Sequence, residues 1–177
     1  KSQIEAEFNA ARSEFEKIFG FPARCCGAPG WQISPDALEI EDESNLLYAS
    51  DTRGETPFIP SMGGKTFKTI QIPSTLLTLD EVLGIEDVAH MHFKRMEKNQ
   101  YNVMTIHSEL EGMAYLDWFD EFLAQARAMG VEFFSLSGLA EELSKQRDSL
   151  PVCEIKMTPF TGRSGNLAVQ QINPNQK

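Results

Sequence analysis

Short apolar segments alternate with amphipathic stretches of about a dozen residues, and this alternation limits the possible fold more than any other feature. Helical patterns cover residues 2–19, 35–43, 79–83, 86–98, 113–129 and 137–146. The segments that predict short strands are 22–26, 46–49, 69–73, 102–107, 131–134, 152–157 and 167–172. Strands that alternate with helices are typical of parallel βαβ units. The sequence therefore predicts an α/β fold with functional side chains at the carboxyl ends of its strands.

The first helix has the clearest pattern. Its apolar side chains recur at steps of three and four residues, at Ile4, Phe8, Ala11, Phe15 and Ile18. Such spacing places them on one face of the helix, which Gly20 is suited to end. The acidic residues of the next helix, 35–43, are interpreted as a solvent-facing surface, and residues 55–68 as a long loop.

Composition excludes several classes of protein. A chain of 177 residues is long enough for one domain with its own core. Its formal charge, 16 minus 26 or −10, argues against a general nucleic-acid surface, which would need a basic face. No segment approaches the ~18 apolar residues of a membrane span. Cys25, Cys26 and Cys153 form no Cys-x-x-Cys pair and are interpreted as reduced thiols of a reducing compartment.

Unusual residues follow three of the predicted strands, namely residues 27–31, 51–53 and 107–109. A histidine such as His107 can transfer a proton near neutral pH. An aspartate within hydrogen-bond reach would fix its tautomer, and Asp51 is the candidate for that role. Arg53 carries a forked set of donors that suits a carboxylate or phosphate. We therefore predict that His107 is a catalytic acid or base with Asp51 as its partner.

Each of these residues also has a structural interpretation. A lone histidine at the end of a strand is often structural, Asp51 and Arg53 can form a polar turn, and Trp31 can be a core aromatic. A cysteine nucleophile at Cys25 or Cys26, acting with His107, is a weaker alternative. His90 and His92 have the spacing of a ligand pair on a strand, but on a helix residues two apart point in different directions. The sequence therefore does not favour a metal site there.

Several segments resemble the deformylase branch of the NodB-like polysaccharide deacetylases. The residues that carry the resemblance are Ala28–Trp31, Tyr48–Gly54 and Thr105–Gly112, with further agreement at Ile72-Pro73, Asp80-Glu81-Val82, Leu136-Ser137, Gly162-Arg163 and Gln170-Gln171-Ile172. These segments keep the family's order from the first helix to the tail. The resemblance implies a distorted (β/α) barrel and metal-assisted hydrolysis of an amide on a sugar.

The resemblance also implies roles for particular residues. His107 matches the acid that protonates the departing nitrogen, and Asp51 lies in the motif that shapes the surroundings of this acid. Trp31, Arg53, Glu109 and Glu111 are expected to bind substrate. Gly27 stands where many members of the family carry an arginine, which the deformylase branch also lacks.

One departure from the family pattern is large. The metal-binding aspartate, the catalytic base and the His-x-x-x-His ligands of the family have no match in these residues. We therefore expect no metal ligands in this chain, and expect a divalent metal, zinc or similar, to be held by residues upstream. Residues 1–177 are interpreted as a single domain, the carboxyl-terminal portion of a NodB-type barrel without its first strands.

The function that the resemblance implies is deformylation or deacetylation of a lipid-linked or polymeric sugar. The expected substrate is 4-deoxy-4-formamido-L-arabinose-phosphoundecaprenol, which belongs to lipid A modification and polymyxin resistance. The alternative is a fragment of this fold that binds a glycan or partner without catalysis. Further expectations are a bacterial protein in the cytoplasm or peripheral on the inner membrane, no nucleic-acid partner, and an upstream fragment of the same protein as a partner.

Overall fold

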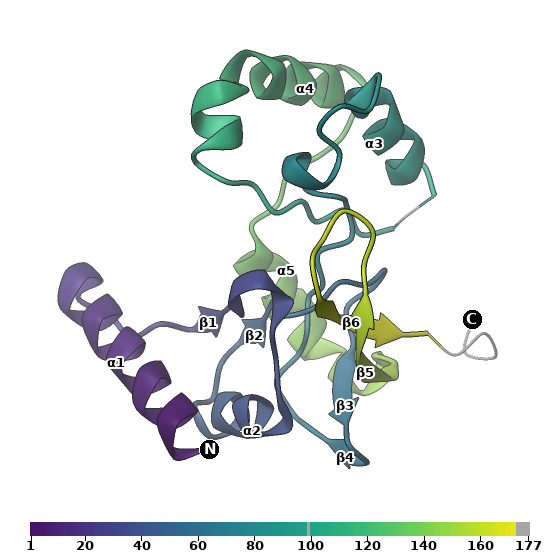
Figure 1. Cartoon of the computed structure of the whole chain (residues 1–177). Helices are drawn as coiled ribbons and strands as arrows, with labels where there is room; N and C mark the ends of the chain where they lie inside the picture. Colours follow the sequence, from purple (N-terminus) through teal and green to yellow (C-terminus); the bar gives the residue numbers. More distant parts are fainter. Residues whose placement is uncertain (99, 173–177) are drawn as a thin grey trace.

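The computed structural model describes residues 1–98 and 100–172 as a mixed α/β fold (Figure 1). Its α-helices are α1 (Ser2–Phe19), α2 (Pro35–Glu43), α3 (Val88–Met96), α4 (Leu116–Ala128) and α5 (Leu136–Lys145). Shorter helical turns are η1 (Pro29–Trp31), η2 (Leu79–Glu81), η3 (Leu110–Ala114) and η4 (Arg147–Ser149). The strands are β1 (Cys25–Cys26), β2 (Tyr48–Ala49), β3 (Ile59–Met62), β4 (Lys65–Thr66), β5 (Val152–Pro159) and β6 (Asn166–Gln171).

The described strands form two small open sheets. In the first, β1 pairs in parallel with β2. The second has the order β4-β3-β5-β6, in which β3 and β5 are parallel and the two outer pairs are antiparallel. The α/β class is thus confirmed, but the pairing is mixed rather than parallel throughout, because β3–β4 and β5–β6 are hairpins.

The main core lies between α2 and the four-stranded sheet. Along β5 the buried side chains alternate with exposed ones, so that Cys153 and Ile155 face inward. They pack with Leu38 of α2 and with Phe58 and Phe67 of the β3–β4 region. This packing fixes the hairpin β5–β6, whose turn reaches the candidate site.

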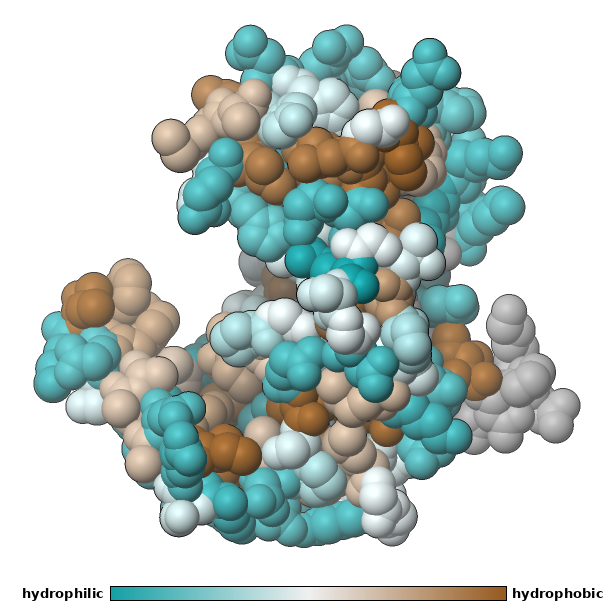
Figure 2. Space-filling model, viewed as in Figure 1, coloured by the Kyte–Doolittle hydropathy of each residue, from teal (hydrophilic) through white to brown (hydrophobic). Residues whose placement is uncertain are grey.

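Helices α3 and α4 form a separate lobe, drawn at the top of Figure 1. Its core is aromatic: the Phe122 ring stacks on Phe93 at 5.0 Å and on Trp118 at 5.4 Å between centroids. Figure 2 shows a band of hydrophobic atoms across the front of this lobe. Exposed apolar side chains in the segments that join η2, α3 and α4 include Leu83, Ile85, Met113, Tyr115 and Leu116.

Helix α1 confirms the predicted range of residues 2–19, and Gly20 ends it in a left-handed conformation. The helix buries none of its residues and stands to one side of the molecule (Figure 1). Its apolar face continues into the following loop, since the rings of Phe15 and Phe19 contact each other and the ring of Phe21, just after the helix. Among the described residues this face therefore packs mainly on itself.

Two predicted strands are absent from the described part of the chain, a third is reduced to isolated bridges, and one predicted loop is wrong. Residues 102–107 and 131–134 are irregular, whereas the expected loop at 55–68 contains the hairpin β3–β4. In the predicted strand 69–73, Gln71 forms a parallel bridge with Ala49 and an antiparallel bridge with Phe58. The carbonyl of Val103 accepts hydrogen bonds from the backbone N–H groups of Thr75 and Leu76, which belong to another irregular segment. A β-branched run becomes a strand only where a neighbouring strand completes the ladder. The segment before His107 is therefore irregular rather than a strand.

Candidate active site

Asp51 holds the loop that carries Trp31. Its Oδ1 accepts a hydrogen bond from the backbone N–H of Ala28 at 2.7 Å, and its Oδ2 accepts one from Nε2 of Gln71 at 2.7 Å. The carboxyl group is fully buried, and this burial raises its pKa. With both oxygens engaged in this way, Asp51 fixes the loop relative to the segment around Gln71.

Arg53 lies between two aromatic rings. Its guanidinium carbon is 4.8 Å from the centroid of Trp31 and 4.7 Å from that of Phe160. Its Nη2 donates to the carbonyl of Leu76 at 2.8 Å and lies 3.3 Å from Glu81. Burial lowers the pKa of Arg53 to about 10, while the charge of Glu81 opposes that shift. Arg53 therefore remains a buried cation at neutral pH.

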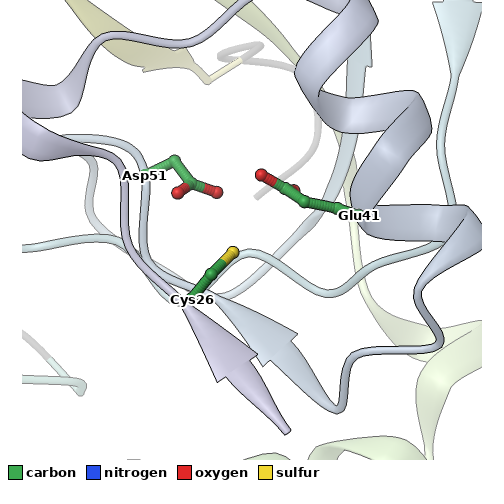
Figure 3. A group of neighbouring side chains, drawn as sticks. All are labelled: Cys26, Glu41 and Asp51. Atoms are coloured by element: carbon green, nitrogen blue, oxygen red, sulfur yellow. The ribbon is translucent and has the colours of Figure 1, made fainter. Parts of the chain in front are cut away.

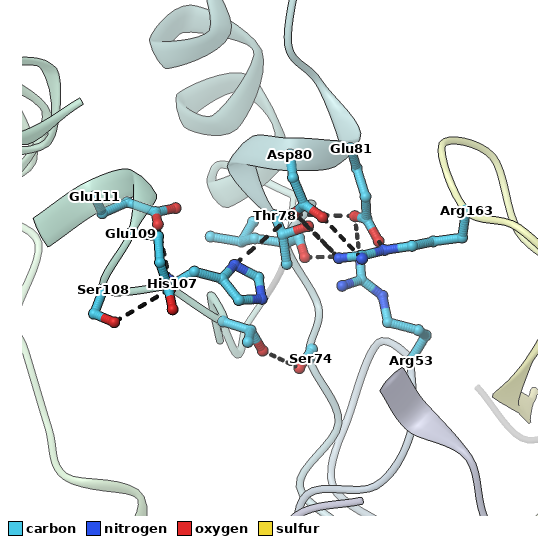
Figure 4. Close-up of polar contacts among 12 residues, drawn as sticks. Arg53, Ser74, Thr78, Asp80, Glu81, His107, Ser108, Glu109, Glu111 and Arg163 are labelled. Carbon is cyan, nitrogen blue, oxygen red and sulfur yellow. Dashed lines mark hydrogen bonds and ion pairs between the residues drawn. The ribbon is translucent and has the colours of Figure 1, made fainter. Parts of the chain in front are cut away.

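Arg163, in the turn between β5 and β6, also lies against Trp31. Its guanidinium binds Asp80 at 2.8 Å through Nη1 and Glu81 at 2.9 Å through Nε (Figure 4). Its carbon lies 5.1 Å from the centroid of Trp31. Gly162 allows this approach, because a Cβ at that position would lie 2.9 Å from the carbonyl oxygen of Glu81.

Two carboxylates lie against His107, one at its backbone and one at its ring. Its backbone N–H donates to Oε2 of Glu111 at 2.8 Å, and its Nδ1 lies 3.9 Å from Oδ1 of Asp80 (Figure 4). The Nδ1 atom is buried without a hydrogen-bond partner, although 38% of the side chain is exposed. The exposed part of the ring therefore lies away from Nδ1, which leaves the Nε2 edge for a ligand.

A hydrogen-bond chain joins the His107 segment to Trp31. The indole N–H of Trp31 donates to Oγ of Ser74 at 3.3 Å, and this hydroxyl pairs with that of Thr105 at 2.7 Å. Thr105 lies two residues before His107. The three segments singled out in the sequence, 27–31, 51–53 and 107–109, therefore meet in one region.

The two glutamates after His107 differ in exposure. Glu111 is fully buried, and its Oε1 has no hydrogen-bond partner. Glu109 is exposed; its own backbone N–H and the hydroxyl of Ser108 lower the pKa of its carboxyl group. Only Glu109 of this pair presents its carboxylate to solvent.

A second cluster of ionisable groups lies behind the site. Ligand atoms of Cys26, Glu41 and Asp51 all lie within 4.8 Å of one another (Figure 3). Burial and the charge of Asp51 raise the pKa of Glu41 to about 9, and burial raises that of Cys26. The interpretation of the acidic residues of α2 as a solvent-facing surface is thus wrong for Glu41, whose side chain points into the molecule.

This cluster does not fit the catalytic metal that the resemblance implies. A catalytic ion needs an open coordination position for water or substrate, and usually histidine ligands. Both Asp51 oxygens already accept hydrogen bonds, and Asp51 and Glu41 are buried. The two other histidines do not join it: His90 and His92 lie on α3 as predicted, and His92 is buried against Phe122. The cluster can hold at most an enclosed ion.

The sequence alone assigned no site role to several residues of this region, namely Glu41, Ser74, Asp80, Glu81 and Arg163, although the last three lie in segments that carry the family resemblance. A local signal existed for two of them. Thr78 and Glu81 have the spacing of a capping box, which the structure contains, and which exposes Asp80 between them. The glycines around Arg163 indicated a tight turn, but no local pattern showed what that turn would approach.

Two curated proteins similar to this chain are named as probable deformylases. The chain is 33% identical over 177 residues to a protein of Wigglesworthia glossinidia brevipalpis assigned as 4-deoxy-4-formamido-L-arabinose-phosphoundecaprenol deformylase ArnD. It is 30% identical over 174 residues to the protein of Shewanella sediminis with the same assignment. These alignments cover 97% and 96% of this chain. The resemblance to ArnD and the polysaccharide deacetylases is confirmed.

A solved structure shows the same fold. A protein of Mycobacterium smegmatis, assigned as a polysaccharide deacetylase, superposes with a TM-score of 0.65 at 15% identity and covers 88% of this chain. No family model matches the chain. The chain spans only 61% and 55% of the two ArnD proteins and 60% of the solved deacetylase. In the described residues, no helix is both long and apolar enough to cross a membrane.

Proposed function

We propose that this chain supplies the proton donor of a metal-dependent deformylase or deacetylase that acts on a lipid-linked sugar. The ArnD relatives point to 4-deoxy-4-formamido-L-arabinose-phosphoundecaprenol as the substrate and to lipid A modification as the process. The observation that carries the proposal is the setting of His107. One ring nitrogen is enclosed beside a carboxylate, and the opposite edge of the ring is exposed.

His107 acts as the general acid in this proposal. Amide hydrolysis requires a proton on the departing nitrogen, since an amine anion is too basic to leave. Protonated His107 donates that proton from its exposed edge. Asp51 acts at a distance by holding the loop that carries Trp31, so that it shapes the surroundings of the acid without touching it.

The remaining predicted residues form the wall of the substrate site. Trp31, Arg53 and Glu111 are buried and shape this wall from behind, whereas Glu109 is exposed and can accept hydrogen bonds from sugar hydroxyl groups. The exposed apolar side chains between η2 and α4 suit contact with a lipid tail or the membrane surface. The protein then acts in the cytoplasm or at the inner membrane of a bacterium.

We further propose that residues 1–177 form a single domain that corresponds to the carboxyl-terminal portion of a NodB-type barrel. The open sheets and the 55–61% coverage of the ArnD relatives support this proposal. The divalent metal is then held in the part of those relatives that this chain does not span. Such a metal would supply activated water, and His107 of this chain would supply the proton.

Substitution of His107 tests the proposal. In the complete protein with its metal, we expect His107→Ala to lower the rate of formate release from the lipid-linked formamido sugar about 10²–10⁴-fold. Metal content, measured by elemental analysis, should stay unchanged. Loss of metal in equal measure would make His107 a ligand instead of an acid. Full activity of the variant, or wild-type protein that binds a glycan without hydrolysing it, would favour the non-catalytic alternative.

A further inference from the structure

The unpaired ring nitrogen of His107 has one carboxylate close to it. Nδ1 is buried without a hydrogen bond, and Oδ1 of Asp80 lies 3.9 Å away. This distance is that of an ion pair and is longer than a hydrogen bond. A buried polar atom without a partner costs free energy, so a small rotation of the partly exposed ring toward Asp80 is favoured.

Asp80 itself is held in place. Its Oδ2 lies 2.8 Å from Nη1 of Arg163, and its Oδ1 accepts hydrogen bonds from Nη2 of Arg163 at 3.1 Å and from the hydroxyl of Thr78 at 2.5 Å. Charge-assisted contacts of this kind fix both the charge and the orientation of a carboxylate. Asp80 therefore presents a fixed anion to His107.

Asp51, the partner expected from the sequence, is engaged elsewhere. Its two oxygens accept hydrogen bonds from Ala28 and Gln71. The ion-pair partner of His107 in the described structure is Asp80, which is separated from it by 27 positions in the sequence.

We propose that Asp80, held by Arg163, is the positioning residue for His107. With the ring turned slightly toward it, Asp80 accepts a hydrogen bond from Nδ1–H, which fixes the tautomer, and its negative charge stabilises the imidazolium that donates a proton from Nε2. Arg163 acts one step further away by holding Asp80. The role of His107 as an acid rests on the proposed function, but the coupling between Asp80 and His107 does not.

Other charges face His107, and they determine what a test must compare. Arg163 holds Asp80 from the β5–β6 turn, Glu111 lies on η3, and Glu109 directly precedes η3. The remaining pair, Arg53 and Glu81, is close to neutral as a unit. Among the described residues, Asp80 is the carboxylate that pairs with Nδ1, so its removal favours loss of the imidazolium proton.

An NMR titration of the histidine rings tests the proposal directly. The chain has three histidines, so His107→Gln assigns the signal of His107. We expect Asp80→Asn to move the titration midpoint of His107 to lower pH by about 0.5–1 unit, as for a unit charge near 4 Å in a largely aqueous setting. In the complete enzyme, the alkaline limb of the kcat profile should move in the same direction, with KM little changed.

Two control variants separate this coupling from general effects. Asp148→Asn removes the same charge from an exposed position on η4 and should leave the midpoint within about 0.2 unit. Asp51→Asn removes the carboxylate that the sequence suggests as the partner of His107, and it should also leave the titration midpoint of His107 within about 0.2 unit. An unchanged midpoint in folded Asp80→Asn, or an equal shift in Asp51→Asn, would overturn the proposal.

A reciprocal measurement keeps the test decisive if Asp80→Asn does not fold. In the wild-type protein, the side-chain carboxyl carbon of Asp80 should show an inflection at the pH where His107 titrates. His107→Gln should abolish this inflection, and its persistence would refute the coupling. A coupling found in a protein without hydrolase activity would leave this inference intact and refute only the proposed function.

Discussion

At the scale of single residues, two buried ionisable pairs have opposite consequences. Arg53 and Glu81 carry opposite charges 3.3 Å apart, and aromatic rings enclose the cation. Glu41 and Asp51 carry the same charge when both are ionised, and neither reaches solvent. Two buried carboxylates cannot both be ionised cheaply, so this second pair holds one proton at neutral pH.

The second pair predicts a pH dependence of stability. A carboxyl group whose native pKa lies above its unfolded value binds more protons in the native state than in the unfolded state. For Glu41 the native value is about 9 and the ordinary value 4.5, so the free energy of unfolding falls as pH rises through that window. Stability of the wild-type protein should therefore be greatest near the acidic end of this range.

Glu41→Gln imitates the protonated carboxyl group and should remove this dependence. Between pH 6 and 8 the free energy of unfolding of the wild-type protein should fall by on the order of 1–2 kcal/mol, whereas that of the variant should not show this fall. Urea denaturation at both pH values, with a chelator present so that no ion replaces the proton, measures the difference. Parallel pH dependence in the two proteins would show that the pair does not share a proton in this way.

At the scale of elements, the turn between β5 and β6 closes the site. Gly162 has a φ of +84° and lies against the backbone of Glu81, which lets Arg163 reach Asp80. Gly165 in the same turn also has a positive φ, of +77°, but a Cβ at that position would meet nothing within 4 Å. The two glycines thus share a conformational requirement and differ only in their surroundings.

Alanine substitutions at these glycines should separate the two effects. In both variants the new alanine must adopt the left-handed conformation, which should lower the free energy of unfolding by about 1 kcal/mol each. In Gly162→Ala the added Cβ also collides with the carbonyl oxygen of Glu81. This variant should therefore lose about 1–3 kcal/mol more of its free energy of unfolding than Gly165→Ala, as measured by urea denaturation. It should also displace Arg163 and move the His107 titration. Equal losses of stability in the two variants would mean that the turn is not in tight contact with η2.

The helices could be predicted from the sequence because their periodicity is local. The ranges 2–19, 35–43 and 137–146 agree with α1, α2 and α5 to within one residue at each end. The sequence could not show that the segments 102–107 and 131–134 are irregular, because strand formation depends on a partner strand that can lie anywhere in the chain. The contacts of Arg163 with Asp80 and Glu81 span more than 80 residues, so only the whole fold reveals them.

At the scale of the whole molecule, most of the chain shares packed cores, and α1 does not. The main core joins α2 to the sheet, and a second core joins β2 and β3 to α5 through Tyr48, Ile59 and Leu143. Helix α1 is tied to the rest largely through ion pairs of Lys1 with Asp36 and Glu39. Exposed ion pairs of this kind contribute little to stability.

Amide hydrogen exchange should therefore distinguish α1 from α5. Most of the stability of a helix in a protein comes from the packing of its apolar face, and α1 buries none of its residues. The amides of α1 should therefore exchange at least about tenfold faster than those of α5, which buries Ala140 and Leu143. Mass spectrometry of peptides from both helices measures this ratio. Measurements at low and high protein concentration supply the control, because self-association through Phe19 and Phe21 would protect α1 only at high concentration. Protection of α1 equal to that of α5 at low concentration would show that the helix is stabilised within one molecule by packing stronger than these ion pairs.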